Sequence, residues 1–371
     1  MSLFADHPRA RWAVPAGAVV VIAAGSLLAS RTASADSGLP PRSAAQLLVD
    51  VQQSTTRQLS GTVVQTANLG LPAIPGLTGQ ASGSPAANGG AANLTSIVSG
   101  THTWRVWLGG ASQARVALVG GSGESDVIRN GDDVWVWSSA DKSAVHHTLT
   151  KDAKASAGTP SLSPTDLPKT PDEAAQKALA AIDPTTQVTT AGTAVVAGRQ
   201  AYELVLQPKT KDTRVAQVRI AVDADKHVPL RVQVYSTKVA NPAVEVGFTS
   251  VDFAAPDARQ FAFTPPPGTK VTEGDAAAPG TTKPATKPAE PKVVGSGWTS
   301  VAVAQLPAQL AGGTQDTQLQ SLLTAVPKVS GDWGSGRLVD GTLFSAVLTD
   351  DGRVAVGAVA PETLYAALKA S

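Results

Sequence analysis

The feature that most constrains this chain is a run of alternating apolar and polar residues across residues 198–268. The alternation recurs in four successive segments, around Leu204, Ile220, Val232 and Val246. A period of two places successive side chains on opposite faces of a strand, so the pattern predicts a meander with one apolar face and one wetter face. Short polar segments separate the first runs, as tight turns require. The sequence therefore predicts an antiparallel sheet.

Similar alternation precedes this region, in residues 103–118 and 126–149. Asn130-Gly131 is a hairpin-turn dipeptide, and it leads into Val134-Trp135-Val136-Trp137. That strand is apolar on both faces. It is therefore either buried on both sides or part of a wall that contacts a bound apolar ligand.

Segments poor in large apolar residues divide the chain into regions. Residues 69–93 are mostly Gly, Pro, Ala, Ser and Asn, and they bury too little to repay ordering, which predicts a mobile insertion between strands. Residues 273–292 carry four prolines among Ala, Thr and Lys, which indicates a semi-rigid linker. The linker separates a large domain, residues 40–272, from a small α+β domain, residues 293–371. Helices are predicted within residues 40–54, 171–182 and 318–326 and after Pro361.

The first 35 residues have the three-part pattern of an export signal. A modestly basic start precedes an uncharged, mostly apolar run from Trp12 to Ser30, and Ala33-Ser34-Ala35 supplies small residues at a cleavage spacing. The run of about 19 residues is near the lower limit for a spanning helix, so an uncleaved membrane anchor is the alternative to a signal peptide. Both alternatives predict an extracytoplasmic protein, either secreted or anchored at the outer face of the cytoplasmic membrane.

Composition and motifs argue against several function classes. The 371 residues carry a net charge of +1, and no basic cluster is long enough to follow a nucleic-acid backbone. Cysteine is absent, which removes disulfides and thiolate chemistry. His146-His147 is a poor metal pair because adjacent strand residues point to opposite faces, and Asp132-Asp133 occupies a turn. We therefore expect no enzymatic activity, no metal, no cofactor and no nucleic-acid partner.

Five short motifs follow one another along the chain: Leu59–Gln65, Asn130–Trp137, Gly198–Pro208, Ile220–Arg231 and Phe261–Val271. In this order they resemble the LolA/RseB-like family of exported proteins, which includes LolA-like lipoprotein carriers and MucB/RseB-like proteins. Trp137 departs from the family pattern, in which tyrosine is usual, and the insertion at residues 69–93 is another departure. The resemblance implies an α+β fold: an antiparallel half-barrel of about 11 strands covered by helices, followed here by the small C-terminal α+β domain.

The resemblance also implies an apolar cavity for the acyl chains of a lipid or lipoprotein. The same residue types would form an ordinary packed core, so the sequence leaves both interpretations open. The leading hypothesis is an exported, non-enzymatic carrier. The alternative is an RseB-like envelope sensor whose C-terminal domain binds a membrane partner such as an anti-sigma factor, and a cell-wall hydrolase is the least supported class. The residues expected to line the cavity are Trp104, Val106, Val116, Leu118, Trp135, Trp137, Leu204, Leu206, Val218, Ile220, Leu230, Val232 and Val234.

Overall fold

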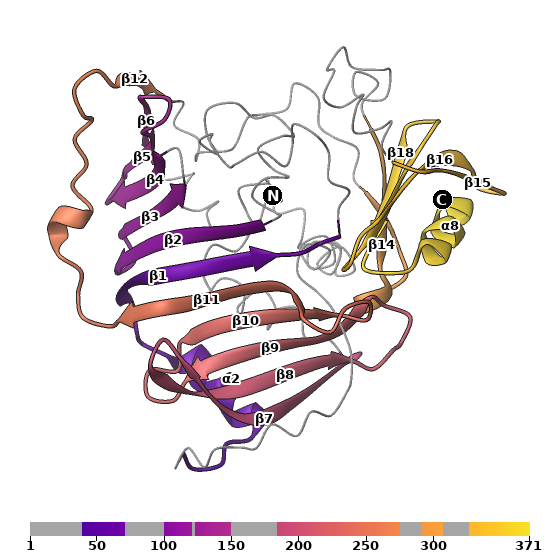
Figure 1. The fold of residues 1–371 in the computed structure, drawn as a ribbon, viewed down its shortest axis with the longest axis horizontal. Coiled ribbons are helices and arrows are strands. Elements are labelled where there is room, and N and C mark those ends of the chain that lie inside the picture. The colour runs from indigo at the N-terminus through magenta and orange to yellow at the C-terminus, as the bar shows by residue number, and fades with distance from the viewer. Residues whose placement is uncertain (1–38, 71–99, 121–122, 150–183, 275–290, 307–325) are drawn as a thin grey trace.

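The computed structural model describes residues 39–70, 100–120, 123–149, 184–274, 291–306 and 326–371 (Figure 1). The N-terminal export segment, most of the predicted insertion and linker, and the helices predicted at residues 171–182 and 318–326 (all but Val326) fall outside this part of the chain. Among the described helices, none is long and apolar enough to cross a membrane.

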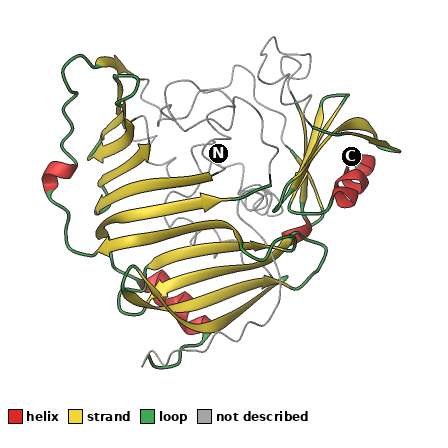
Figure 2. Cartoon of the chain, in the orientation of Figure 1, coloured by secondary structure: helices red, strands yellow, loops and turns green. Residues whose placement is uncertain are grey.

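Strands dominate the described residues, and they form two sheets (Figure 2). The large sheet has 12 strands in the order β12-β6-β5-β4-β3-β2-β1-β11-β10-β9-β8-β7. All neighbours are antiparallel except β12 and β6, which are parallel. The strands are β1 (Gln58–Ala67), β2 (Gly100–Gly109), β3 (Gln113–Gly120), β4 (Gly123–Asn130), β5 (Asp133–Ser138), β6 (Ser143–Thr148), β7 (Thr186–Val196), β8 (Arg199–Pro208), β9 (Val215–Asp223), β10 (Pro229–Ser236), β11 (Pro242–Asp252) and β12 (Lys270–Glu273).

The helix α2 (Ala44–Gln53) packs against β7 and β8. Ser43 and Gln46 form a reciprocal capping box at its start, in which each side chain accepts a hydrogen bond from the other residue's backbone N–H, at 3.2 and 2.9 Å. Leu47 is fully buried in the same core as Leu204. We call the sheet face that carries Leu204 and contacts α2 the inner face, and the other the outer face.

The second sheet has six strands in the order β13-β14-β18-β17-β16-β15. The helix α8 (Pro361–Ala370) packs on β14, β17 and β18, and Val303, Val347 and Leu364 belong to the core between them. Trp333 stacks on Tyr365 with ring centroids 5.1 Å apart. The elements are β13 (Lys292–Val294), η4 (Gly297–Thr299), β14 (Val301–Gln305), β15 (Lys328–Gly331), β16 (Gly334–Asp340), β17 (Ser345–Thr349) and β18 (Arg353–Gly357).

The two sheets meet through a buried arginine. Arg214, at the start of β9, donates from Nε to the carbonyl oxygen of Val359 at 2.9 Å and from Nη1 to that of Gly341 at 3.3 Å. Its Nη2 lies 2.5 Å from an Asp340 carboxylate oxygen. One side chain of the large sheet thus contacts two separate loops of the small one.

Further hydrogen bonds and an apolar cluster join the two sheets. The indole N–H of Trp298 donates to Thr186 Oγ1 at 2.7 Å, and Ser236 Oγ donates to the carbonyl oxygen of Thr342 at 2.5 Å. Trp298 and Leu343 belong to the same buried cluster as the inner face of the large sheet. The small sheet is therefore packed against the ends of the large-sheet strands, not held by the linker alone (Figure 1).

The sequence prediction of an antiparallel sheet is confirmed, with two differences. The large sheet has 12 strands instead of about 11, because residues 270–273 return to the sheet and pair with β6. Within the described residues one α-helix, α2, packs on this sheet, whereas several covering helices were expected.

Candidate ligand-binding face

The first half of the inner face is built from residues that pair across β2, β3, β4 and β5. Trp104 pairs with Leu118, and Val106 pairs with Val116. The row of Val116 continues to Val127 in β4 and then to Val136 in β5. Because residues paired across strands share a face, these side chains form one apolar surface.

The second half repeats the arrangement in β8, β9 and β10. One row joins Leu204, Ile220 and Val232 across the three strands. A second row on the same face lies two residues away along each strand. All are almost fully buried. The second row consists of Leu206, Val218 and Val234, and Leu230 lies on the same face beside them.

Trp135 and Trp137 do not belong to this surface, which corrects the expectation from sequence. Trp137 pairs with Asp126, and Trp135 pairs with Ile128, so both tryptophans lie on the outer face. Val136, between them, is the β5 residue on the inner face. The physical reason is that successive residues of a strand point to opposite faces. A segment in which every residue is apolar therefore does not indicate which of its faces continues the apolar face of the neighbouring strands.

The two tryptophans instead form an aromatic cluster on the outer face. The ring of Phe263 packs against Trp135 at 5.4 Å and against Trp137 at 5.9 Å between centroids. Trp135 also stacks on His146, with centroids 4.3 Å apart and planes 23° apart. A segment that follows β11 therefore covers the outer face at β5 and β6.

The inner face is not uniformly covered. Around β7 and β8 it packs against α2, and the Tyr202 hydroxyl donates to the carbonyl oxygen of Pro40 at 2.9 Å. Around β3 and β4, Val116 is half-buried and Val127 is 37% exposed. The accessible part of the apolar surface therefore lies at β3 and β4.

Two polar features of the inner face were not predicted from sequence. Gln65 pairs with His102 across β1 and β2, and its Oε1 accepts a hydrogen bond from the Trp104 indole N–H at 3.2 Å. A row of serines, Ser125 and Ser138 with Ser143, lies next to the valine row. The polar position of Gln65 in the alternation of β1 was the available signal, because its neighbours Val63 and Ala67 on the same face are apolar.

The outer face is polar where β8 to β11 lie. Glu203 accepts a hydrogen bond from Arg231 at 2.9 Å and lies 3.7 Å from Arg219. Gln233 donates to Glu245 at 2.8 Å. The inner face is therefore the apolar side of the sheet at β8 to β11.

One outer-face carboxyl group has an unusual environment. Asp126 is buried, and burial raises the pKa of its carboxyl group to about 7, although the Arg115 guanidinium at 2.5 Å acts in the opposite direction. Its Oδ1, the Arg115 Nε and the Trp137 Nε1 are all buried without a hydrogen-bond partner. No group of three or more potential metal ligands occurs among the described residues.

Residues 93–264 match the sequence family described as the MucB/RseB N-terminal domain. The chain carries a LolA/RseB-like domain. The motif-based recognition is thereby confirmed, and this LolA/RseB-like domain contains all eleven expected cavity residues that lie on the inner face. No curated protein sequence matches the chain.

Solved structures with weak similarity to the chain include MucB and LolA-superfamily proteins. A complex of MucA and MucB from Pseudomonas aeruginosa is 14% identical, with a TM-score of 0.41, covering 87% of this chain and 94% of that one. A LolA-superfamily protein from Nitrosomonas europaea is 9% identical, with a TM-score of 0.22, covering 60% and 99%. A lipoprotein-sorting protein domain from Vibrio parahaemolyticus is 12% identical, with a TM-score of 0.23, covering 59% and 97%.

Proposed function

We propose that the protein is an exported, non-enzymatic binding protein that holds the acyl chains of a lipid or lipoprotein against the inner face. The observation that carries the proposal is the apolar surface that crosses β2 to β5 without a charged side chain in the valine row. The LolA/RseB-like domain supports the same class of function, and the apolar segment within residues 1–35 supports export.

The chemistry of the surface suits an acyl chain better than a polar ligand. Each methylene group removed from water contributes about 0.8 kcal/mol, and aliphatic side chains provide this without fixing an orientation. The binding residues we propose are the eleven expected positions on the inner face: Trp104, Val106, Val116, Leu118, Leu204, Leu206, Val218, Ile220, Leu230, Val232 and Val234. The accessible Val127 is the twelfth.

A matched pair of substitutions tests this proposal. Val127 and Val119 lie on adjacent strands and are 37% and 41% exposed, but they are on opposite faces of the sheet. Val127→Asp places a charge in the proposed site, whereas Val119→Asp places the same charge on the outer face. We expect lipid, identified by mass spectrometry after extraction of protein purified from its native host, to be at least tenfold lower in Val127→Asp and unchanged in Val119→Asp.

Two outcomes contradict the proposal. One is native protein that carries no lipid and does not bind a fluorescent fatty acid. The other is equal loss of lipid in both variants, since this would mean that the charge acts through stability and not through the site. Circular dichroism of both variants shows whether the fold is retained.

A second candidate function is an envelope sensor that transmits ligand binding to a membrane partner such as an anti-sigma factor. The contact of Arg214 with Asp340, Gly341 and Val359 favours it, because a carrier needs no second sheet fixed to its binding domain. The expected result is that an integral membrane protein co-purifies with the native chain and is lost with Arg214→Ala. Co-purification that survives loss of residues 293–371 would contradict this role for the C-terminal region.

A further inference from the structure

One row of inner-face residues, beside the valine row of β2 to β5, contains a charged side chain. Arg129 pairs with Ala114 in β3 and with Val134 in β5, so it lies on the same face as Val127, two residues earlier in β4. No inner-face position of the strands β1 to β6 is occupied by Asp, Glu, Lys or another Arg. Within these strands, Arg129 is therefore the one inner-face side chain with a fixed charge.

The charge of Arg129 is not neutralised by the chain itself. Its Nε donates to the carbonyl oxygen of Gly131 in the adjoining turn at 3.0 Å, and Arg129 forms no ion pair within the described part of the chain. On the outer face, by contrast, Arg115 and Arg231 each pair with a carboxylate. The side chain of Arg129 is partly exposed. Its Nη1 and Nη2 are left to donate, as a fork, to two oxygens of one anion.

Arg129 lies next to the accessible part of the apolar surface. Val127 is 37% exposed, and two residues of a β-strand span about 7 Å. An arginine side chain covers such a distance with its aliphatic stem on apolar surface and its charged group in water. The head group of a lipid whose acyl chain lies on Val116 and Val127 is therefore within reach of the guanidinium group.

A second basic residue of this row, His147, is engaged by the chain. It pairs with Val134, and the backbone of Gly274 packs against its ring, since a Cβ added at Gly274 would lie 2.2 Å from His147 Cε1. The charge of an arginine, unlike that of a histidine, is independent of pH in the range where proteins fold. We therefore assign the contact with a ligand to Arg129 alone.

We propose that Arg129 binds the anionic head group of the lipid whose acyl chains occupy the inner face. The ligand class is then an anionic lipid, with phosphate or carboxylate oxygens that accept from Nη1 and Nη2, and not a neutral acylglycerol. The inference rests on the proposed function and names the class of lipid at the same site. Aliphatic side chains bind an acyl chain without fixing its direction, whereas a charged contact at Arg129 fixes the position of the head group.

Three probes separate the head group from the acyl chains. Phosphatidic acid carries both, diacylglycerol with the same acyl chains lacks the phosphate, and glycerol phosphate lacks the chains. Each competes with a fluorescent diacylglycerol for the full-length chain. We expect phosphatidic acid to bind about tenfold more tightly than diacylglycerol, because charge-assisted hydrogen bonds contribute this much to affinity. Glycerol phosphate should not displace the fluorescent lipid, since it makes no apolar contact.

Variants of Arg129 show whether the preference depends on its charge. Arg129→Gln should bind both lipids equally, with its affinity for diacylglycerol unchanged. Arg129→Lys should keep most of the preference, because it retains the charge although it loses the Nε contact with Gly131. A role in the turn alone would make the two variants behave alike. Arg105→Gln is the matched control, since Arg105 is exposed on the outer face and should affect neither affinity.

Several outcomes would overturn the assignment of Arg129. These are equal affinity of the native chain for the two lipids, a preference for phosphatidic acid that survives in Arg129→Gln, and equal loss of both affinities in that variant. Displacement of the fluorescent lipid by glycerol phosphate would indicate a site for free anions instead. A native chain that binds neither lipid would contradict the proposed function itself, and this result is distinct from a loss of preference.

Discussion

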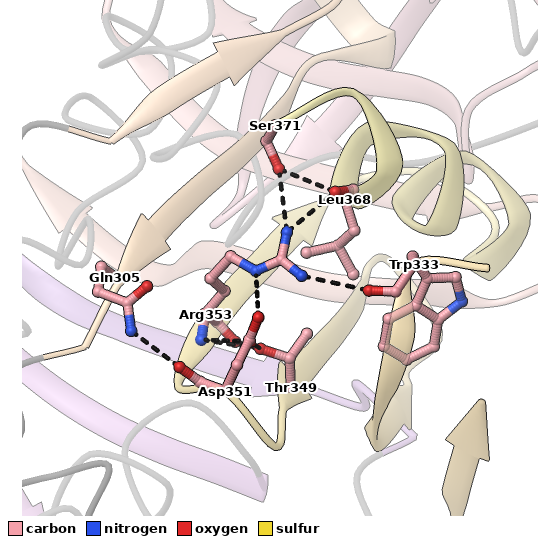
Figure 3. A network of polar contacts seen from close by, with 7 residues as sticks. All are labelled: Gln305, Trp333, Thr349, Asp351, Arg353, Leu368 and Ser371. Carbon is pink, nitrogen blue, oxygen red and sulfur yellow. Dashed lines mark hydrogen bonds and ion pairs between the residues drawn. The ribbon is translucent and has the colours of Figure 1, made fainter. Parts of the chain in front are cut away.

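At the scale of single residues, Arg353 is the side chain on which the end of the small sheet depends (Figure 3). Its Nη1 donates to the carbonyl oxygen of Leu368 at 2.9 Å, and its Nη2 donates to that of Trp333 at 3.2 Å. Its Nε donates to Asp351 at 2.9 Å. The guanidinium group thus satisfies a carbonyl at the end of α8, where a positive charge is also favoured by the helix dipole.

We predict that Arg353→Ala lowers the free energy of unfolding of the small sheet by about 2 kcal/mol, because it leaves the half-buried carbonyl oxygens without donors. Arg353→Lys should recover part of this, since it restores the charge but not the forked geometry. Hydrogen exchange of the α8 amides at increasing urea concentrations measures this free energy. Lys369→Ala is the control, because its exposed pair with Asp332 contributes little. Equal effects of Arg353→Ala and Lys369→Ala would contradict the assignment.

Residue type separated the inner face from the outer face in one part of the large sheet but not in another. The alternation around Leu204 and Ile220 predicted the inner-face residues correctly, because polar neighbours such as Glu203 and Arg219 mark the other side. The segment Val134–Trp137 contains no polar residue, so its pattern does not indicate on which face the tryptophans lie. Their pairing with Asp126 and Ile128 in the β4–β5 hairpin places both tryptophans on the outer face.

At the scale of elements, sequence predicted the strands better than their partners. Asn130-Gly131 predicted the turn between β4 and β5. In the structure Asn130 pairs with Asp133, so Gly131 and Asp132 form the tip of the hairpin. The order of the sheet, in which β1 lies between β2 and β11, depends on contacts between residues nearly 200 positions apart. A local pattern contains no information of that kind.

The short strand β12 illustrates the same limit. Residues 270–273 have little apolar content to mark a strand, and all four are exposed. They pair with β6, and Glu273 contacts His146, which lies 127 residues earlier in the chain. The sequence motif that ends at Val271 predicted the closing segment of the domain but not its partner strand.

At the scale of the whole molecule, the position of the small sheet was the property that sequence left open. A proline-rich linker predicts a spacer, whereas the two sheets share a buried cluster that includes Trp298, Leu343 and Leu204. Arg214, which is buried, adds hydrogen bonds from one sheet to the other. A linker sets how far two units can separate, but the contacts between them decide whether they do.

We predict that Arg214→Ala releases the small sheet from the large one. The substitution removes the guanidinium group that pairs with Asp340 and donates to two backbone carbonyl groups. Asp340 is 42% exposed, so most of the expected cost of about 2 kcal/mol comes from the carbonyl groups left without a donor. The radius of gyration from small-angle X-ray scattering should rise, and thermal unfolding should separate into two transitions. Lys238→Ala removes a more exposed contact with the same Asp340 and should leave both measurements nearly unchanged. A single unfolding transition and an unaltered radius in Arg214→Ala would mean that the apolar cluster alone holds the two sheets together.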